Sequence, residues 1–206
     1  MWADVGYYLR CNGSPGSTLF PDEKGNTTTP NGGAQVSGTF SAFGGGSAQL
    51  LSNADWIDVP SPAIGTADFC LEFQYRYAGL HFTIPMDYRP ASTNGLYPCL
   101  YVDNGIINFF VNGASLIVAS TAMTDSTFQS VRLDRASGTT TLYLNGSSVG
   151  SVSDSNAYLG TRARFGSSGY DPATVTGCGY LDEIRGTFGA SRGATGLPQT
   201  AEWPNS

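Results

Sequence analysis

A chain of 206 residues with 40% hydrophobic and 12% aromatic residues can bury a sizeable core, which excludes wholesale disorder. Lys and Arg number 10 against 16 Asp and Glu, and no basic cluster occurs, so nucleic acid is not an expected partner. No apolar run approaches the roughly 20 residues that span a bilayer, so membrane insertion is not expected either.

Short stretches in which apolar and polar residues alternate recur along the whole chain, which is the period of a β-strand with one buried face. The 27 Gly and 11 Pro residues fit turns between many short strands. No window of helical length keeps an apolar period of 3.6 residues. In chain order, we expect strands over residues 6–11, 34–40, 47–51, 56–59, 68–77, 81–85, 96–102, 106–111 and 115–119, then a three-stranded hairpin series over 128–152 and a closing strand over 179–188.

The hairpin series over residues 128–152 carries the strongest signal. Its two turns are predicted at Ser137-Gly138 and at Asn145-Gly146, and Asn-Gly is a strong hairpin signal because both central turn positions need a positive φ. Apolar residues on either side alternate with polar ones, so we expect one face buried and the other in water. The class is therefore antiparallel all-β, and strand spacings of about ten residues are typical of a sandwich or barrel.

No repeat or linker divides the chain, so we expect one domain over residues 1–190, followed by a Pro-containing C-terminal tail or arm over 191–206. Trp203 lies in the part of this tail that is a candidate arm for reaching a neighbouring subunit. The four cysteines are far apart and form no C-x-x-C motif, so buried free thiols are favoured over disulfides. The N-terminus shows no basic stretch followed by an apolar run, so no signal peptide is predicted.

Several motifs occur in a characteristic order along nearly the whole chain. They are YYLRCNG, PDEKGN, FSAFGGGSAQL, WIDVP, DFCLEFQYRY, VRLDRASGTTTLYLNGSSVGS and GYLDEIRGTFG. This order resembles the laminin-G-like, concanavalin A-like lectin and glucanase superfamily, in the single-domain form common in bacteriophage structural proteins. The resemblance implies a two-sheet antiparallel jelly-roll sandwich in which the first and last strands share a sheet. Two departures are Asn12, where the family often has Asp, and Phe128, where many relatives have Trp.

The resemblance also implies a structural calcium ion. Relatives often bring a loop near the first strand against an Asp of the closing strand, and Asp22, Asn26 and Asp182 are the matching oxygen donors here. Calcium takes about 6–8 such oxygens. The alternative is that Asp22 and Asn26 cap a turn while Asp182 binds nearby backbone.

Carbohydrate recognition needs aromatic faces in a groove, with polar groups that set the orientation of the sugar. Most aromatic residues fall at alternating strand positions and are explained as core. Three tyrosines in expected loops, Tyr88, Tyr158 and Tyr170, are candidate sugar platforms. The alternative for each is packing or a subunit contact. Two long polar segments, 86–95 and 154–172, are either surfaces for a neighbouring protein or plain solvent-facing loops.

Catalytic constellations are not found in the sequence. Retaining glycoside hydrolysis needs two carboxyl groups about 5–5.5 Å apart, but no E-x-D-x-E pattern occurs and Asp182 and Glu183 are adjacent, which aims them at opposite faces. His81 is the single histidine and no G-x-S-x-G elbow occurs. We therefore do not expect an enzyme.

These observations favour a non-enzymatic structural or adhesive component of a virus particle, such as a capsid decoration or tail-associated protein made in the host cytoplasm. Its expected partners are other virion proteins and further copies of itself, and the phage assignment depends on the resemblance. The alternative is a carbohydrate-binding, lectin-like module that recognises cell-surface glycans. A polysaccharide hydrolase is the third possibility.

Overall fold

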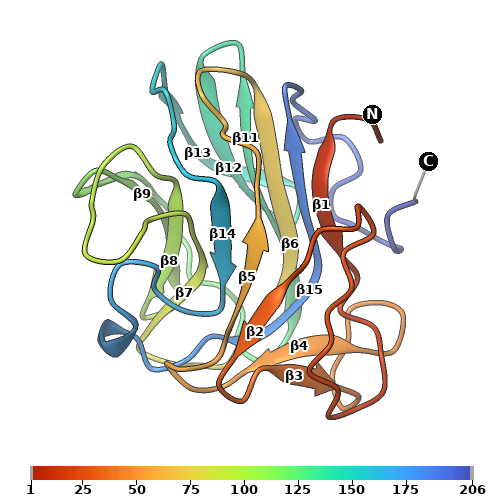
Figure 1. Ribbon diagram of the computed structural model, residues 1–206. Coiled ribbons are helices and arrows are strands. Elements are labelled where there is room, and N and C mark those ends of the chain that lie inside the picture. The colour runs from red at the N-terminus through yellow and green to blue at the C-terminus, as the bar shows by residue number, and fades with distance from the viewer. Residues whose placement is uncertain (1, 205–206) are drawn as a thin grey trace.

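The computed structural model describes residues 2–204, which form two antiparallel β-sheets packed face to face (Figure 1). The eight-stranded sheet contains β1 (Val5–Leu9), β3 (Gln35–Ser37), β4 (Ser47–Leu50), β6 (Phe69–Tyr77), β11 (Phe128–Ala136), β12 (Thr139–Leu144), β13 (Ser147–Ser153) and β15 (Gly179–Phe188). The seven-stranded sheet contains β2 (Thr29–Asn31), β5 (Trp56–Pro60), β7 (Phe82–Asp87), β8 (Cys99–Asp103), β9 (Ile106–Val111), β10 (Ala114–Val118) and β14 (Arg162–Phe165). The two-sheet antiparallel jelly-roll sandwich expected from the sequence is confirmed.

The strand order brings the two ends of the chain together. The larger sheet runs β13-β12-β11-β6-β15-β4-β3, and β1 pairs with β15, where Tyr8 lies opposite Arg185. The smaller sheet runs β10-β9-β8-β7-β14-β5-β2. Neighbouring strands run antiparallel in both, so each rim of a sheet collects strand ends and strand starts in alternation.

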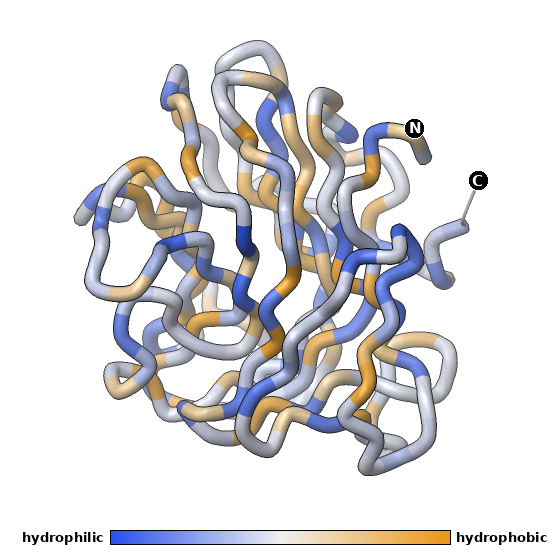
Figure 2. Tube along the Cα trace, in the orientation of Figure 1, coloured by the Kyte–Doolittle hydropathy of each residue, from blue (hydrophilic) through white to orange (hydrophobic). Residues whose placement is uncertain are grey.

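The core lies between the sheets and is built by the alternating apolar residues. Leu71 of β6 and Leu133 of β11 lie opposite each other in the register and are fully buried. Figure 2 shows hydrophobic and hydrophilic residues alternating along the strands. The hairpin series predicted over 128–152 is β11, β12 and β13, with positive φ at Asn145 as its turn requires.

The sequence predicted that the outer face of the hairpin series, which belongs to the larger sheet, is exposed to water. The structure instead shows buried side chains on this outer face. Glu72, Arg132 and Arg185 point outward from β6, β11 and β15, yet their side chains are at most 3% exposed. Residues 189–204 fold back across this face, where Nη1 of Arg132 donates to the carbonyl of Gly193 and the backbone N–H of Arg192 donates to Asp134. The strand period does not reveal this cover. We call this segment the strap.

Trp203 anchors the strap. Its side chain is buried against Tyr8, and its backbone N–H donates to Glu183 at 2.9 Å. The guanidinium carbons of Arg185 and Arg192 lie 4.1 and 4.6 Å from the centroid of its ring, a cation–π arrangement. The described part of the predicted arm thus packs on its own sheet, and residues 205 and 206 of that arm lie outside the described residues.

Three short elements were not predicted from the sequence. They are β2, β14 and a 3-10 helix over Pro172–Thr174, of three or four residues each, too short to show a period. All four cysteines are free and buried, as expected. Residues 2–204 contain no helix long and apolar enough to cross a membrane.

Candidate functional site

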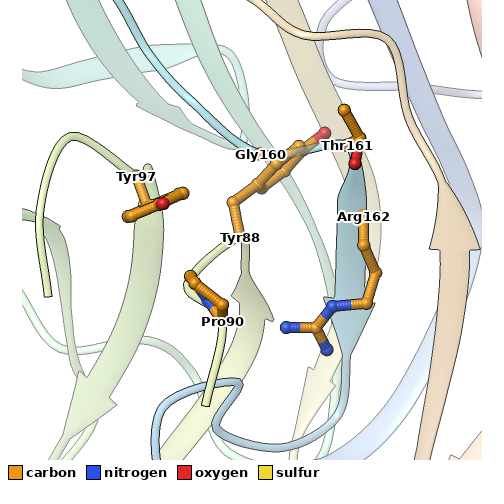
Figure 3. Close-up of a pocket in the computed structure, with 6 residues that line it drawn as sticks. All are labelled: Tyr88, Pro90, Tyr97, Gly160, Thr161 and Arg162. Atoms are coloured by element: carbon orange, nitrogen blue, oxygen red, sulfur yellow. The ribbon is translucent and has the colours of Figure 1, made fainter. Parts of the chain in front are cut away.

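One rim of the seven-stranded sheet forms a pocket. β7 and β5 end at this rim, whereas β14 and β8 begin there, because neighbouring strands run antiparallel. The pocket has a volume of about 430 Å³. We call it the rim pocket, and it is lined by Tyr88, Pro90, Tyr97, Gly160, Thr161 and Arg162 (Figure 3).

Tyr88 is a fixed part of the pocket wall. It is 1% exposed, and its hydroxyl lies 2.8 Å from the hydroxyl of Tyr7. Burial raises the pKa of Tyr88 to about 12, so the phenol stays neutral. Gly160 has φ +104°, and a Cβ there would lie 3.3 Å from both the Tyr88 carbonyl oxygen and Cδ1 of Tyr97. A glycine therefore lets the backbone approach both tyrosines closely.

The segment that carries Pro90 is held by a buried ion pair. Arg89 donates from Nε to Oδ1 of Asp87 at 3.0 Å and from Nη2 to Oδ2 at 2.8 Å, the bidentate geometry of a strong charge-assisted pair. Asp87 is fully buried and also accepts the backbone N–H of Gly169 at 2.8 Å. Figure 3 shows Tyr97, which is half-buried, on the opposite side of the pocket from Thr161 and Arg162.

Arg162 supplies the charge of the pocket. Its Nη1 donates to Oδ1 of Asp58 at 2.9 Å, and its Nη2 donates to the carbonyl of Arg89 at 2.5 Å. Asp58 also holds Arg164, whose Nη2 lies 2.8 Å from Oδ2 and whose guanidinium lies over the ring of Trp56. The Arg162 side chain remains 29% exposed, so it is oriented by its partners while still reaching solvent.

The structure places one of the three predicted sugar platforms in the pocket. Tyr88 lines it, whereas Tyr158 is 1% exposed in the core and donates its hydroxyl to Asp154 at 2.7 Å. Tyr170 is half-buried, with the guanidinium carbon of Arg89 5.5 Å from its ring centroid, and does not line the rim pocket. The predicted sugar-binding roles of these residues stay predictions.

The predicted calcium ligands fall into two separate groups. Asp22 accepts the backbone N–H of Tyr8 at 2.7 Å and that of Asn26 at 3.3 Å. Asp182 instead accepts the N–H of Ala42 at 2.9 Å. Among the described residues, no three His, Cys, Asp or Glu side chains gather closely enough to hold a metal ion. The calcium ion stays a prediction.

The sequence did not single out two of the most important pocket residues, Tyr97 and Arg162. Tyr97 lies in a segment expected to be a strand, and Arg162 begins the unpredicted β14. The two polar segments 86–95 and 154–172 were, however, recognised as candidate surfaces, and the rim pocket forms largely where they meet. What the sequence lacked was the strand order that places them side by side.

No protein-family model matches the sequence, and no curated protein matches it. Solved structures do match the fold. Domain 4 of AbnA, an extracellular GH43 arabinanase from Geobacillus stearothermophilus, determined in complex with arabinotriose, is 14% identical with a TM-score of 0.70. The match covers 95% of this chain and 98% of that domain.

Botulinum neurotoxin structures also match. The binding domain of serotype D/C is 10% identical, with a TM-score of 0.66, and the match covers 94% of this chain and 50% of that domain. A structure of type C, whose cell entry depends on interaction with two ganglioside molecules, is 9% identical with a TM-score of 0.66. This chain spans about half the length of these toxin domains. At such low identities, the likeness shows the fold alone, a two-sheet jelly-roll sandwich.

Proposed function

We propose that this protein is a carbohydrate-binding module that holds a sugar in the rim pocket. The observation that carries the proposal is a half-buried aromatic ring, Tyr97, placed across an open pocket of about 430 Å³ from the oriented guanidinium of Arg162. Ligand pockets commonly fall between about 300 and 1,000 Å³ and combine an apolar wall with a few fixed polar groups. A sugar presents the same two features, an apolar C–H face and a ring of hydroxyls.

Each wall of the pocket has a role in this proposal. The Tyr97 ring and Pro90 offer apolar surface for the C–H face of the sugar. A guanidinium carries five N–H donors in a planar fork, so Arg162 keeps donors for sugar hydroxyls besides those used on Asp58 and Arg89. The exposed hydroxyl of Thr161 adds a group that donates and accepts. The arabinotriose complex of the arabinanase domain and the ganglioside interaction of the type C toxin support the proposal by analogy.

A glycan array followed by isothermal titration calorimetry tests the proposal. The wild-type protein is expected to bind at least one glycan saturably, and Tyr97→Ala is expected to weaken that binding roughly two- to tenfold, since aromatic contacts contribute about 0.5–1.5 kcal/mol. Tyr143→Ala, a half-buried tyrosine of β12 in the other sheet, is the matched control and should leave the affinity unchanged. Equal affinities for wild type and Tyr97→Ala would contradict the assignment of the pocket.

The proposed module binds sugar without cleaving it. Asp58 and Asp87, the carboxylates beside the rim pocket, are both committed to arginine partners. Retaining hydrolysis instead needs one carboxyl as acid and a second as nucleophile, about 5–5.5 Å apart. Incubation with arabinan, laminarin and alginate should release no reducing ends above a protein-free blank, and release that grows with protein concentration would contradict this part of the proposal.

The role in a virus particle stays a prediction from the sequence resemblance. None of the compared structures named above is a virion protein, whereas two of them have sugar ligands or receptors. A glycan-binding module and a particle protein that attaches to a cell surface share the same binding step. Electron microscopy of particles that carry this chain would decide between a free module and a shell or tail component, and would report any multimer.

A further inference from the structure

The rim pocket borders a second depression. This depression, with a volume of about 280 Å³, shares Thr161 and Arg162 with the rim pocket and adds Asp58 and Pro60 at the end of β5. Arg162 and Pro60 are opposite each other in the register of β14 and β5. The two depressions therefore lie side by side, over one strand and its direct neighbour.

A third depression extends the path further. It has a volume of about 290 Å³, shares Thr27 with the second depression, and is bounded by Leu19 and Pro21. Leu19 is 73% exposed, the largest exposure among the large hydrophobic side chains that stand out on the described surface. The three depressions thus lie in a row in which each shares a lining residue with the next, and we call this row the rim groove, with apolar surface near Tyr97 at one end and near Leu19 at the other.

The strand order gives the length of the rim groove. Tyr97 precedes β8 and Thr29 begins β2, and between them the sheet runs β8-β7-β14-β5-β2. Neighbouring strands lie about 4.8 Å apart, so four strand spacings carry the groove over roughly 19 Å before it reaches Leu19. A pyranose ring is about as long as one strand spacing. The path is therefore long enough for several sugar units in a row.

The chemistry of the groove alternates in a way that suits a chain of sugars. Apolar surface at Tyr97 is followed by the exposed hydroxyl of Thr161, by the Arg162 and Asp58 pair, and by the exposed hydroxyl of Thr27, before apolar surface returns at Leu19. We infer that the rim groove binds an extended oligosaccharide of three or more units lying across the strands, rather than a single terminal sugar. This inference rests on the proposed function and adds the class of ligand.

Titration calorimetry with matched oligosaccharide series tests this inference. The probes are arabino-, cello- and laminari-oligosaccharides of one to six units. For the series that binds, affinity is expected to rise at least tenfold between one unit and four and then to level off. The double variant Leu19→Ser/Thr27→Val is expected to weaken binding of the tetramer three- to tenfold while leaving the dimer unchanged. Leu51→Ser, another exposed leucine outside the groove, is the matched control for Leu19→Ser.

The outcomes separate the two proposals. If sugars of one unit and six units bind with the same affinity, and Tyr97→Ala still lowers that affinity, the inference of an extended ligand is overturned while the proposed sugar pocket is kept. A tetramer affinity unaffected by Leu19→Ser/Thr27→Val would also overturn it. Absence of binding in all three series and on the glycan array would overturn the proposed function itself. Because Leu19 and Thr27 are exposed, both changes should leave the fold intact, which circular dichroism would verify.

Discussion

Glu72 holds together the buried charges beneath the strap. The registers of β6 with β11 and of β6 with β15 place it directly beside Arg132 and Arg185. One carboxylate oxygen accepts Nε of Arg132 at 2.8 Å, and the other accepts Nε of Arg185 at 2.7 Å. Nη1 of Arg192, which belongs to the strap, lies 3.7 Å from Oε1 of Glu72. A single anion, 2% exposed, thus neutralises part of the charge of three guanidinium groups.

Glu72→Gln keeps the shape of this side chain and removes its charge. Breaking a buried ion pair by removing one partner costs about 3–5 kcal/mol, because the remaining charge stays out of water without compensation. With about 2–4 °C lost per kcal/mol for a chain of this size, the melting temperature is expected to fall by roughly 6–20 °C. Thermal unfolding followed by circular dichroism measures the fall in melting temperature. Urea unfolding at neutral pH, followed by tryptophan fluorescence, measures the loss of unfolding free energy.

Asp103→Asn is the matched control, since it removes an acidic charge from a side chain that is 51% exposed. Exposed ion pairs contribute about 0–1 kcal/mol, so its effect should stay within that range. A loss of unfolding free energy below about 1 kcal/mol for Glu72→Gln would mean that water reaches the three arginines and that the strap does not seal this face, contrary to this prediction.

Three further predictions concern the strap, the pH dependence and the expected metal. Trp203→Ala should cost about 3–5 kcal/mol, as is usual for a buried Trp, and should expose residues 189–204 to limited proteolysis; resistance equal to that of wild type would contradict the anchoring role. Burial raises the pKa of Asp182 from 3.8 to about 8, so between these values the folded protein holds a proton that the unfolded chain releases. The contribution of Asp182 to stability therefore falls as pH rises from about 4 to about 8. Asp182→Asn should flatten the dependence of unfolding free energy on pH in this range, as measured by urea unfolding. Parallel pH profiles for the wild type and the variant would be evidence against this prediction. Excess EDTA tests the predicted calcium ion: a fall in melting temperature that added calcium reverses would establish the ion, whereas an unchanged melting temperature would favour the alternative in which Asp22 and Asp182 hold only backbone N–H groups.

The fold was predictable from the sequence because its signals are local. Alternation over β6 and β11 and the Asn145-Gly146 turn depend only on near neighbours in the chain. The strap was not predictable as a cover, since residues 189–204 show no strand period and Trp203 is attached to Tyr8, which lies 195 residues away in the sequence. The outer polar residues of β6 consequently looked solvent-facing.

The candidate site was only partly predictable for a related reason. Tyr88 stood out because an aromatic residue in a polar segment is a local feature. Tyr97 and Arg162 became pocket residues through strand order, since β8, β7 and β14 are neighbours at one rim although Tyr97 and Arg162 are far apart in the chain. A pattern read along a single sequence does not contain that order.

The most direct measurement is a crystal structure of the protein with an oligosaccharide that it binds in solution. Sugar density is expected in the rim pocket, with one ring against Tyr97, a hydrogen bond from Arg162, and further units running past Pro60 toward Leu19. Sugar bound at a surface away from the seven-stranded sheet, with the rim pocket empty, would contradict it.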